Sequence, residues 1–172
     1  MKIFSISIED YFEKNIELIQ NRFCDWDIEK WIKVKYKKRN NRVVLSSVVL
    51  NIDMGKFKNY ENSNYSINIK EIIYPKTEDK VFTLKYSYEI RNSKDLSDFV
   101  RFDYKPSNDF PDLHINSDEN KWGNHLTYPD STNIDLEKLD CIKAINIFNA
   151  FVAHPDEHIL DKDKNERYLK CL

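Results

Sequence analysis

Alternation of apolar and polar residues limits the fold of this sequence more than any other feature. The alternation begins at Ile28 and returns in a series of segments separated by turns, the last of which ends at Asn116. Because successive side chains of a β-strand point to opposite faces, each segment predicts a strand with one buried face. Strands adjacent in sequence usually pair, so the series predicts an antiparallel meander of about six strands. The predicted strands cover residues 28–37, 43–52, 65–74, 81–90, 99–104 and 111–116.

The sequence also predicts how these strands are connected and which side of a strand faces the core. Asn40 and Asn41 separate the first two segments, and asparagine tolerates the positive φ of a tight hairpin. Pro75 is expected to stop the third strand, because proline has no N–H for a sheet. In the fourth strand, the side predicted to face the core carries Phe82, Leu84, Tyr86, Tyr88 and Ile90.

Helical spacing replaces alternation near both ends of the chain. Apolar residues three and four apart predict an amphipathic helix from Ser7, its N-cap, to Phe23. A second helix, capped by Thr132 or Asn133, is expected to present a broad apolar face before Pro155. At 172 residues one hydrophobic core is expected. We therefore predict a single α+β domain over 1–172, divided into an N-terminal helix (1–25), a sheet (26–117), a C-terminal helix (131–154) and a charged tail (155–172).

Composition excludes several classes of protein. The net charge of −2 argues against a globally basic nucleic-acid binder. The three cysteines, Cys24, Cys141 and Cys171, are widely spaced, which indicates no disulfide framework and no zinc knuckle. Two glycines cannot build a glycine-rich phosphate loop, and no apolar run approaches the ~20 residues of a membrane span. We expect a cytoplasmic protein that needs no metal, cofactor or membrane.

The candidate functional residues gather around the last two predicted strands. Period two places Arg101 and Asp103 on one face of their strand, and Asp112 and His114 on one face of the next. If these faces coincide, an arginine, two carboxylates and an imidazole can bind phosphate, relay protons or hold a metal ion. The structural alternative is a cross-strand ion pair with a hydrogen-bonded histidine. His125, in an irregular stretch, is a further candidate because loops often hold binding residues.

A second candidate surface is the first predicted strand, where Lys33, Lys35 and Lys37 share one face. Such lysines can contact nucleic-acid phosphates, but lysines on an outer strand also protect an edge from aggregation. We favour edge protection and expect at most weak, non-specific nucleic-acid binding.

Four short motifs in a fixed order carry a family resemblance. "YSYEIRN", "VRFDYKP", "FPDLHIN" and a helix from "NIDLEKL" resemble the TumE-type toxins of bacterial toxin-antitoxin pairs, over roughly Phe82 to Val152. That family tends to carry a His-x-His pair after the proline, whereas Asp112 stands at the first of these positions and only His114 remains. The departure weakens a metal or acid-base role, and the resemblance implies no catalytic mechanism.

Two functional hypotheses follow. The first is a small cytoplasmic toxin-like protein of a toxin-antitoxin or defence module, with Arg101, Asp103, His114 and His125 on its functional surface. The second is a non-enzymatic interaction module that docks a protein partner, such as an antitoxin or a complex subunit, through its sheet. The sequence does not decide whether the protein is an enzyme, because it contains no complete catalytic set.

Overall fold

The α+β architecture is confirmed in the computed structural model, which describes residues 2–4, 6–23, 27–55, 64–77, 80–106, 112–118, 126–127 and 134–153. Its helices are α1 (Ile8–Phe23), α2 (Ile28–Trp31) and α4 (Cys141–Ala153). Its strands are β1 (Lys2–Phe4), β2 (Ile32–Arg39), β3 (Arg42–Gly55), β4 (Tyr65–Thr77), β5 (Lys80–Asn92), β6 (Phe99–Tyr104), β7 (Leu113–Ser117) and β8 (Leu126–Thr127).

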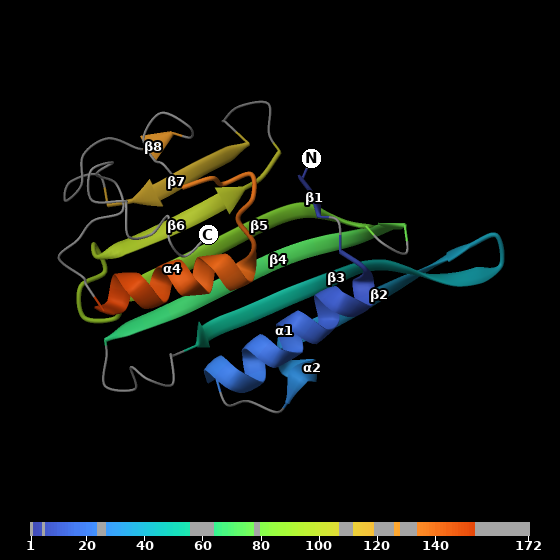
Figure 1. The fold of residues 1–172 in the computed structure, drawn as a ribbon, viewed down its shortest axis with the longest axis horizontal. Coiled ribbons are helices and arrows are strands. Elements are labelled where there is room, and N and C mark those ends of the chain that lie inside the picture. Colours follow the sequence, from blue (N-terminus) through green and yellow to red (C-terminus); the bar gives the residue numbers. More distant parts are fainter. Residues whose placement is uncertain are drawn as a thin grey trace.

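One antiparallel sheet contains all of these strands (Figure 1). Strands β2 to β7 pair in sequence order, which confirms the predicted six-strand meander. The sequence patterns did not predict two short additions. β8 extends the sheet beyond β7, and β1 pairs with the first part of β5 through Lys2↔Thr83 and Phe4↔Val81.

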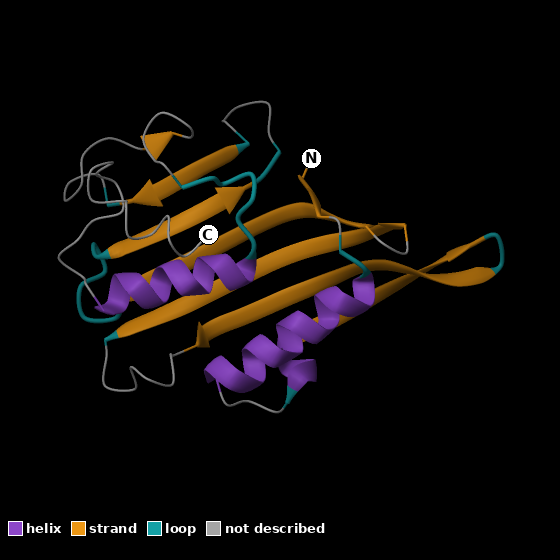
Figure 2. Ribbon diagram, viewed as in Figure 1, coloured by secondary structure: helices purple, strands orange, loops and turns teal. Residues whose placement is uncertain are grey.

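Helices α1 and α4 lie on the same face of the sheet, here called the inner face (Figure 2). The core is the layer between them and the strands, where the rings of Phe102 and Phe148 stack with centroids 5.8 Å apart. Ile19 of α1 and Tyr88 of β5 are fully buried in the same layer. The opposite, outer face carries no helix among the described residues. None of the described helices is long and apolar enough to cross a membrane.

The hairpin between β2 and β3 has the predicted turn. Asn40 and Asn41 adopt φ values of 50° and 59°, the left-handed conformation that a two-residue hairpin requires. The end of this hairpin extends beyond the other strands (Figure 1). Every residue of β2 after Ile32 is exposed on both faces, because β2 is the edge strand of the sheet.

The first strand is shorter than predicted, because a turn of helix occupies its expected start. α2 covers Ile28–Trp31, and β2 begins at Ile32. Trp31 and Ile32 are both buried although they are adjacent. Two neighbouring residues of a strand cannot face one core, whereas a helix rotates side chains by about 100° per residue. The helical turn therefore turns Trp31 inward instead of leaving it among the lysines.

A β-bulge corrects the predicted face of β5. Ile72 pairs with Lys85 but Ile73 pairs with Thr83, which leaves Leu84 as an extra residue. Leu84 is 43% exposed rather than buried as predicted, while Thr83 is fully buried. An inserted residue reverses the alternation. The prediction therefore holds after the bulge, at Tyr86, Tyr88 and Ile90. It is wrong before the bulge, where Leu84 is exposed and Phe82, although buried, pairs with Tyr74 on the outer face.

Two element boundaries also differ from the prediction. β4 continues through Pro75 to Thr77, at a point where the described part of β4 pairs only with β5, so the missing N–H of proline is tolerated. α4 begins at Cys141, with the Oδ1 atom of Asp140 accepting the Lys143 N–H at 2.8 Å. Ile134, Leu136 and Leu139 are buried, but in turns before the helix. The predicted caps Thr132 and Asn133 and the tail 155–172 lie outside the described residues.

Candidate functional site

Polar side chains of three neighbouring strands meet on the outer face because the register aligns them. Asp103 of β6 pairs with Ser87 of β5 on one side and with His114 of β7 on the other. Arg101 likewise lies between Glu89 and Asn116. Register partners of an antiparallel sheet point to the same face. The sheet therefore brings two carboxylates, a guanidinium, an imidazole and a carboxamide together.

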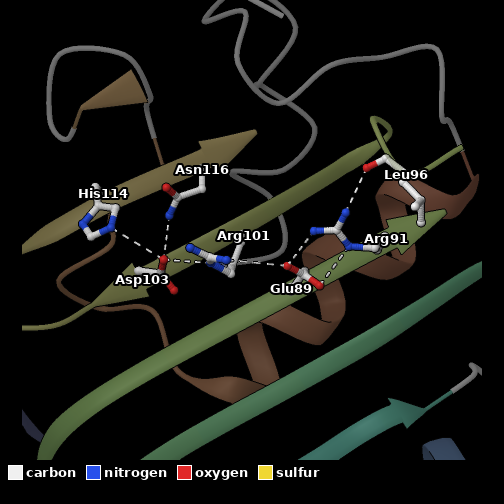
Figure 3. A network of polar contacts seen from close by, with 7 residues as sticks. All are labelled: Glu89, Arg91, Leu96, Arg101, Asp103, His114 and Asn116. Carbon is white, nitrogen blue, oxygen red and sulfur yellow. Dashed lines mark hydrogen bonds and ion pairs between the residues drawn. The ribbon is translucent and has the colours of Figure 1, made fainter. Parts of the chain in front are cut away.

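Asp103 is the centre of this network (Figure 3). Its Oδ2 atom accepts hydrogen bonds from Arg101 Nε at 2.8 Å and from Asn116 Nδ2 at 2.6 Å. The Nε2 atom of His114 lies 3.6 Å from the same oxygen. The Asp103 side chain is only 10% exposed, so this carboxylate interacts mainly with its neighbours and little with solvent.

Glu89 forms the other half of the network. Arg91 donates a hydrogen bond to each of the two Glu89 carboxylate oxygens, both at 3.2 Å. The Nη1 atom of Arg101 lies 3.8 Å from the Oε2 atom of Glu89. Arg91 also donates to the Leu96 carbonyl (Figure 3). Its guanidinium lies over the Phe99 ring. All three guanidinium nitrogens of Arg91 therefore donate to its own neighbours. Arg101, 37% exposed, keeps part of its guanidinium facing solvent.

A pocket of about 500 Å³ on the outer face adjoins this network. Its cationic and imidazole groups are Lys70, Lys85, Arg101, Lys105 and His114. Its neutral lining includes Val49, Asn51, Ile72 and Ser87. Asp103 also lines it, but this carboxylate is already bound by Arg101 and Asn116. The pocket thus combines an apolar floor with an excess of positive charge, a set of groups suited to an anionic ligand with an apolar part.

The predicted site residues divide into three groups. Arg101, Asp103 and His114 come together as expected. Asp112 is exposed in the residue before β7, and Glu89 rather than Asp112 supplies the second carboxylate of the network. His125 lies outside the described residues. Among the residues that the structure does describe, no three His, Cys, Asp or Glu side chains gather closely enough to hold a metal ion.

The three lysines of β2 belong to the same face as the pocket. Lys33 pairs with Val49, which lines the pocket, and Lys35 pairs with Ser47. The Nζ atom of Lys37 lies 5.6 Å from the centre of the Tyr74 ring, on the outer face of β4. All three lysines are exposed. The two candidate surfaces of the sequence are therefore neighbours on one face.

Lys70 and Lys105 are site residues that sequence reasoning missed. Period two placed Lys85 on the face opposite the core, but nothing in the pattern indicated that lysines of β4, β5 and the end of β6 would meet one another. Their meeting depends on the pairing register, which brings Lys70 opposite Ser87. The available signal was the recurrence of lysine at non-core positions of consecutive strands.

A second cavity, of about 450 Å³, lies on the inner side of the sheet, where Tyr11, Asn15, Glu71 and Cys141 meet. The Tyr11 hydroxyl donates to Glu71 at 3.1 Å, and the Cys141 thiol donates to Asn15 Oδ1 at 2.9 Å. Burial, and then the charge of Glu71, raise the pKa of Cys141 and of Tyr11 well above their ordinary values. The thiol is therefore protonated at neutral pH and is a structural group rather than a nucleophile.

The chain matches no protein-family model, no curated protein and no solved structure.

Proposed function

We propose that this protein binds a phosphate-bearing ligand in the outer-face pocket, as a toxin-like component of a bacterial toxin-antitoxin or defence module. The observation that carries the binding function is the convergence of Lys70, Lys85, Arg101 and Lys105 on one pocket. The resemblance of the chain to TumE-type toxins supplies the biological context.

The residues of the pocket have different roles in this proposal. Asp103 holds Arg101 through the Nε atom and Glu89 lies beside Nη1, which leaves Nη2 as the guanidinium nitrogen for a phosphate. The lysines act as point charges around it. His114, placed against Asp103 at the pocket wall, is the group that can exchange a proton with a bound phosphate or hydroxyl.

Binding is tested with a short probe that fits the pocket, a 5′-phosphorylated RNA dinucleotide, by isothermal titration calorimetry. Lys85→Gln and Lys105→Gln are expected to weaken binding several-fold, because both side chains are exposed and line the pocket. Lys14→Gln, on helix α1, is the matched control and should leave the affinity unchanged. Absence of binding by the wild type, or an equal loss in all three variants, would contradict the proposal.

The toxin role is tested by induced expression in a bacterial host. The wild type is expected to arrest growth, whereas Arg101→Ala and His114→Ala should relieve the arrest while the purified variants remain folded by circular dichroism. Normal growth during wild-type expression would refute the toxin role. It would not affect the binding proposal, which the calorimetry tests separately.

A second candidate is the interaction module, favoured by the edge strand β2. Its side chains are exposed on both faces, and Tyr36 and the neighbouring Val43 of β3 are 65% and 66% exposed. An exposed edge of this kind can pair with a strand from a partner. A pull-down from the native host tests it: a stoichiometric partner whose binding survives His114→Ala supports docking, and recovery of the protein alone argues against it.

A further inference from the structure

We infer that the ligand of the outer face is a single nucleic-acid strand, which runs from the pocket across the sheet to β2, where Lys33, Lys35 and Lys37 bind its phosphates. This inference rests on the proposed function of the pocket and specifies its ligand. It also gives the β2 lysines a role beyond the edge protection that the sequence favoured.

The first step is the continuity of the surface, which follows from two rows of register partners. One row runs through Asn51, Lys70, Ser87, Asp103 and His114, from β3 to β7. The other runs through Lys33, Val49, Ile72 and Lys85, from β2 to β5. All of these residues except Lys33 line the pocket. The second row therefore leads directly from the pocket to the lysines of β2.

The second step is the length of this path. Neighbouring strands are ~4.8 Å apart, so the three steps from Lys85 to Lys33 cover roughly 14 Å. Lys33, Lys35 and Lys37 then follow one another at intervals of ~7 Å along β2. Because the pocket ends at Val49, the partner of Lys33, a dinucleotide in it contacts Lys33 at most, whereas a longer strand also reaches Lys35 and Lys37.

The third step is the chemistry along the path, which is not uniformly charged. Val49 and Ile72 are half-buried and apolar, and the half-buried ring of Tyr74 lies between Ile72 and Lys37 on the same face. Apolar and aromatic groups between cations match the base faces and phosphates of a single strand. A polyanion without bases would use only the lysines, and the bases of a duplex are stacked on one another and cannot reach these groups.

The fourth step is the distribution of charge. The whole chain carries a net charge of −2, yet the outer face gathers Lys33, Lys35, Lys37, Lys70, Lys85 and Lys105. Two carboxylates of this face, Asp103 and Glu89, are each held by an arginine. A basic surface on a slightly acidic protein attracts a polyanion to that face.

The test compares a fluorescein-labelled 12-nucleotide single strand with the dinucleotide, by anisotropy at several salt concentrations, with RNA and DNA arms. The variant Lys33→Gln/Lys35→Gln/Lys37→Gln is expected to bind the long strand about 10-fold more weakly at low salt. Its slope of log affinity against log salt should fall by about 2, because each lost phosphate contact removes about 0.7. Dinucleotide binding should change much less, because Lys33 alone borders the pocket.

Two controls match this variant. Lys14→Gln/Lys38→Gln/Lys94→Gln removes the same charge from α1, from the other face of β2 and from the β5–β6 loop, and should keep wild-type affinity. Lys33→Arg/Lys35→Arg/Lys37→Arg should also retain binding. Because all of these lysines are exposed, the variants should fold like the wild type.

Each outcome separates the two proposals. If the wild type does not bind the dinucleotide, the proposed function of the pocket is refuted, and the proposed path of the strand with it. Normal dinucleotide binding with unchanged long-strand affinity in the β2 variant refutes the path alone. Equal losses in the β2 variant and its charge-matched control, or equal affinity for heparin or duplex, overturn the single-strand assignment. A preference between the RNA and DNA arms identifies the kind of strand.

Discussion

Asp103 and His114 are partners across β6 and β7, with the Oδ2 atom of Asp103 3.6 Å from the Nε2 atom of His114. The same oxygen accepts hydrogen bonds from Arg101 and Asn116. One carboxylate oxygen therefore arranges three side chains from two strands, and the geometry of the proposed pocket depends on it.

Removing this carboxylate should destabilise the fold measurably. Asp103→Ala is expected to lower the free energy of unfolding by about 1–3 kcal/mol, because it leaves the donors of Arg101 and Asn116 without their acceptor in a largely buried place. Urea denaturation measures the change. Asp112→Ala, at an exposed position nearby, should stay within about 0.5 kcal/mol of the wild type. Equal effects of the two variants would show that Asp103 does not organise the network.

Two stacked tyrosines of β5 should respond in opposite ways to the loss of a hydroxyl group. Tyr86 donates to the Leu136 carbonyl at 3.0 Å, so Tyr86→Phe should lower the free energy of unfolding by about 1 kcal/mol. The hydroxyl of Tyr88 is fully buried and has no hydrogen-bond partner within the described part of the chain. Tyr88→Phe should therefore leave the stability unchanged or raise it by up to about 1 kcal/mol. A clear loss in Tyr88→Phe would indicate a partner for that hydroxyl.

Cys141 should resist alkylation in the folded protein. Burial, followed by the nearby charge of Glu71, raises the pKa of its thiol, and the thiolate is the reactive form. In a Cys24→Ser/Cys171→Ser background, iodoacetamide at neutral pH should modify Cys141 far more slowly than it modifies the same protein in denaturant. Mass spectrometry gives both rates, and similar rates would contradict the buried placement.

The same raised pKa values predict a loss of stability in alkali. Groups whose pKa is higher in the folded than in the unfolded protein stabilise the fold fully below the unfolded pKa, and this contribution is lost as the pH rises toward the folded pKa. For Cys141 the loss should begin above about pH 8.5, and for Tyr11 and Tyr88 above about pH 10. Urea denaturation as a function of pH should show a smaller decline near pH 9 for Cys141→Ala than for the wild type. Identical pH profiles would show that ionisation of the Cys141 thiol does not cause the decline in stability.

The tip of the β2–β3 hairpin should accept glycine but not a β-branched residue. Asn41 has a φ of 59°, a conformation that glycine adopts freely and valine does not. Asn41→Gly should keep the amide chemical shifts of β2 and β3, whereas Asn41→Val should disturb them, with faster hydrogen exchange near the turn. An undisturbed Asn41→Val spectrum would mean that the turn changes type without cost.

The sequence allowed the meander and part of the site to be predicted, because both depend on period two. Alternation placed Arg101 with Asp103, and it placed Lys85 away from the core. The residues that joined them from other strands were not predictable, because a contact between strands depends on register. Glu89 replaced Asp112 in this way, through its pairing with Arg101.

Most errors in the predicted fold occur where a bulge or a helical turn interrupts the alternation of a strand. The bulge at Leu84 reverses the faces within a single strand, and one helical turn at Trp31 replaces the start of another. Neither leaves a signal in the local pattern, because Leu84 has a hydropathy typical of a core residue and Ile28–Trp31 alternates like a strand. Three-residue β1 is too short to show any period.

The position of β1 has a consequence for the order in which the chain folds during synthesis. β1 pairs with residues 81–83, and the Tyr11 hydroxyl of α1 donates a hydrogen bond to Glu71. Neither element can therefore contact its partner until the ribosome has made the middle of the sheet. The contact between Asn15 and Cys141 forms later still. Contacts between residues far apart in the sequence slow folding. During translation α1 therefore emerges before the strands and the helix that cover its apolar stripe.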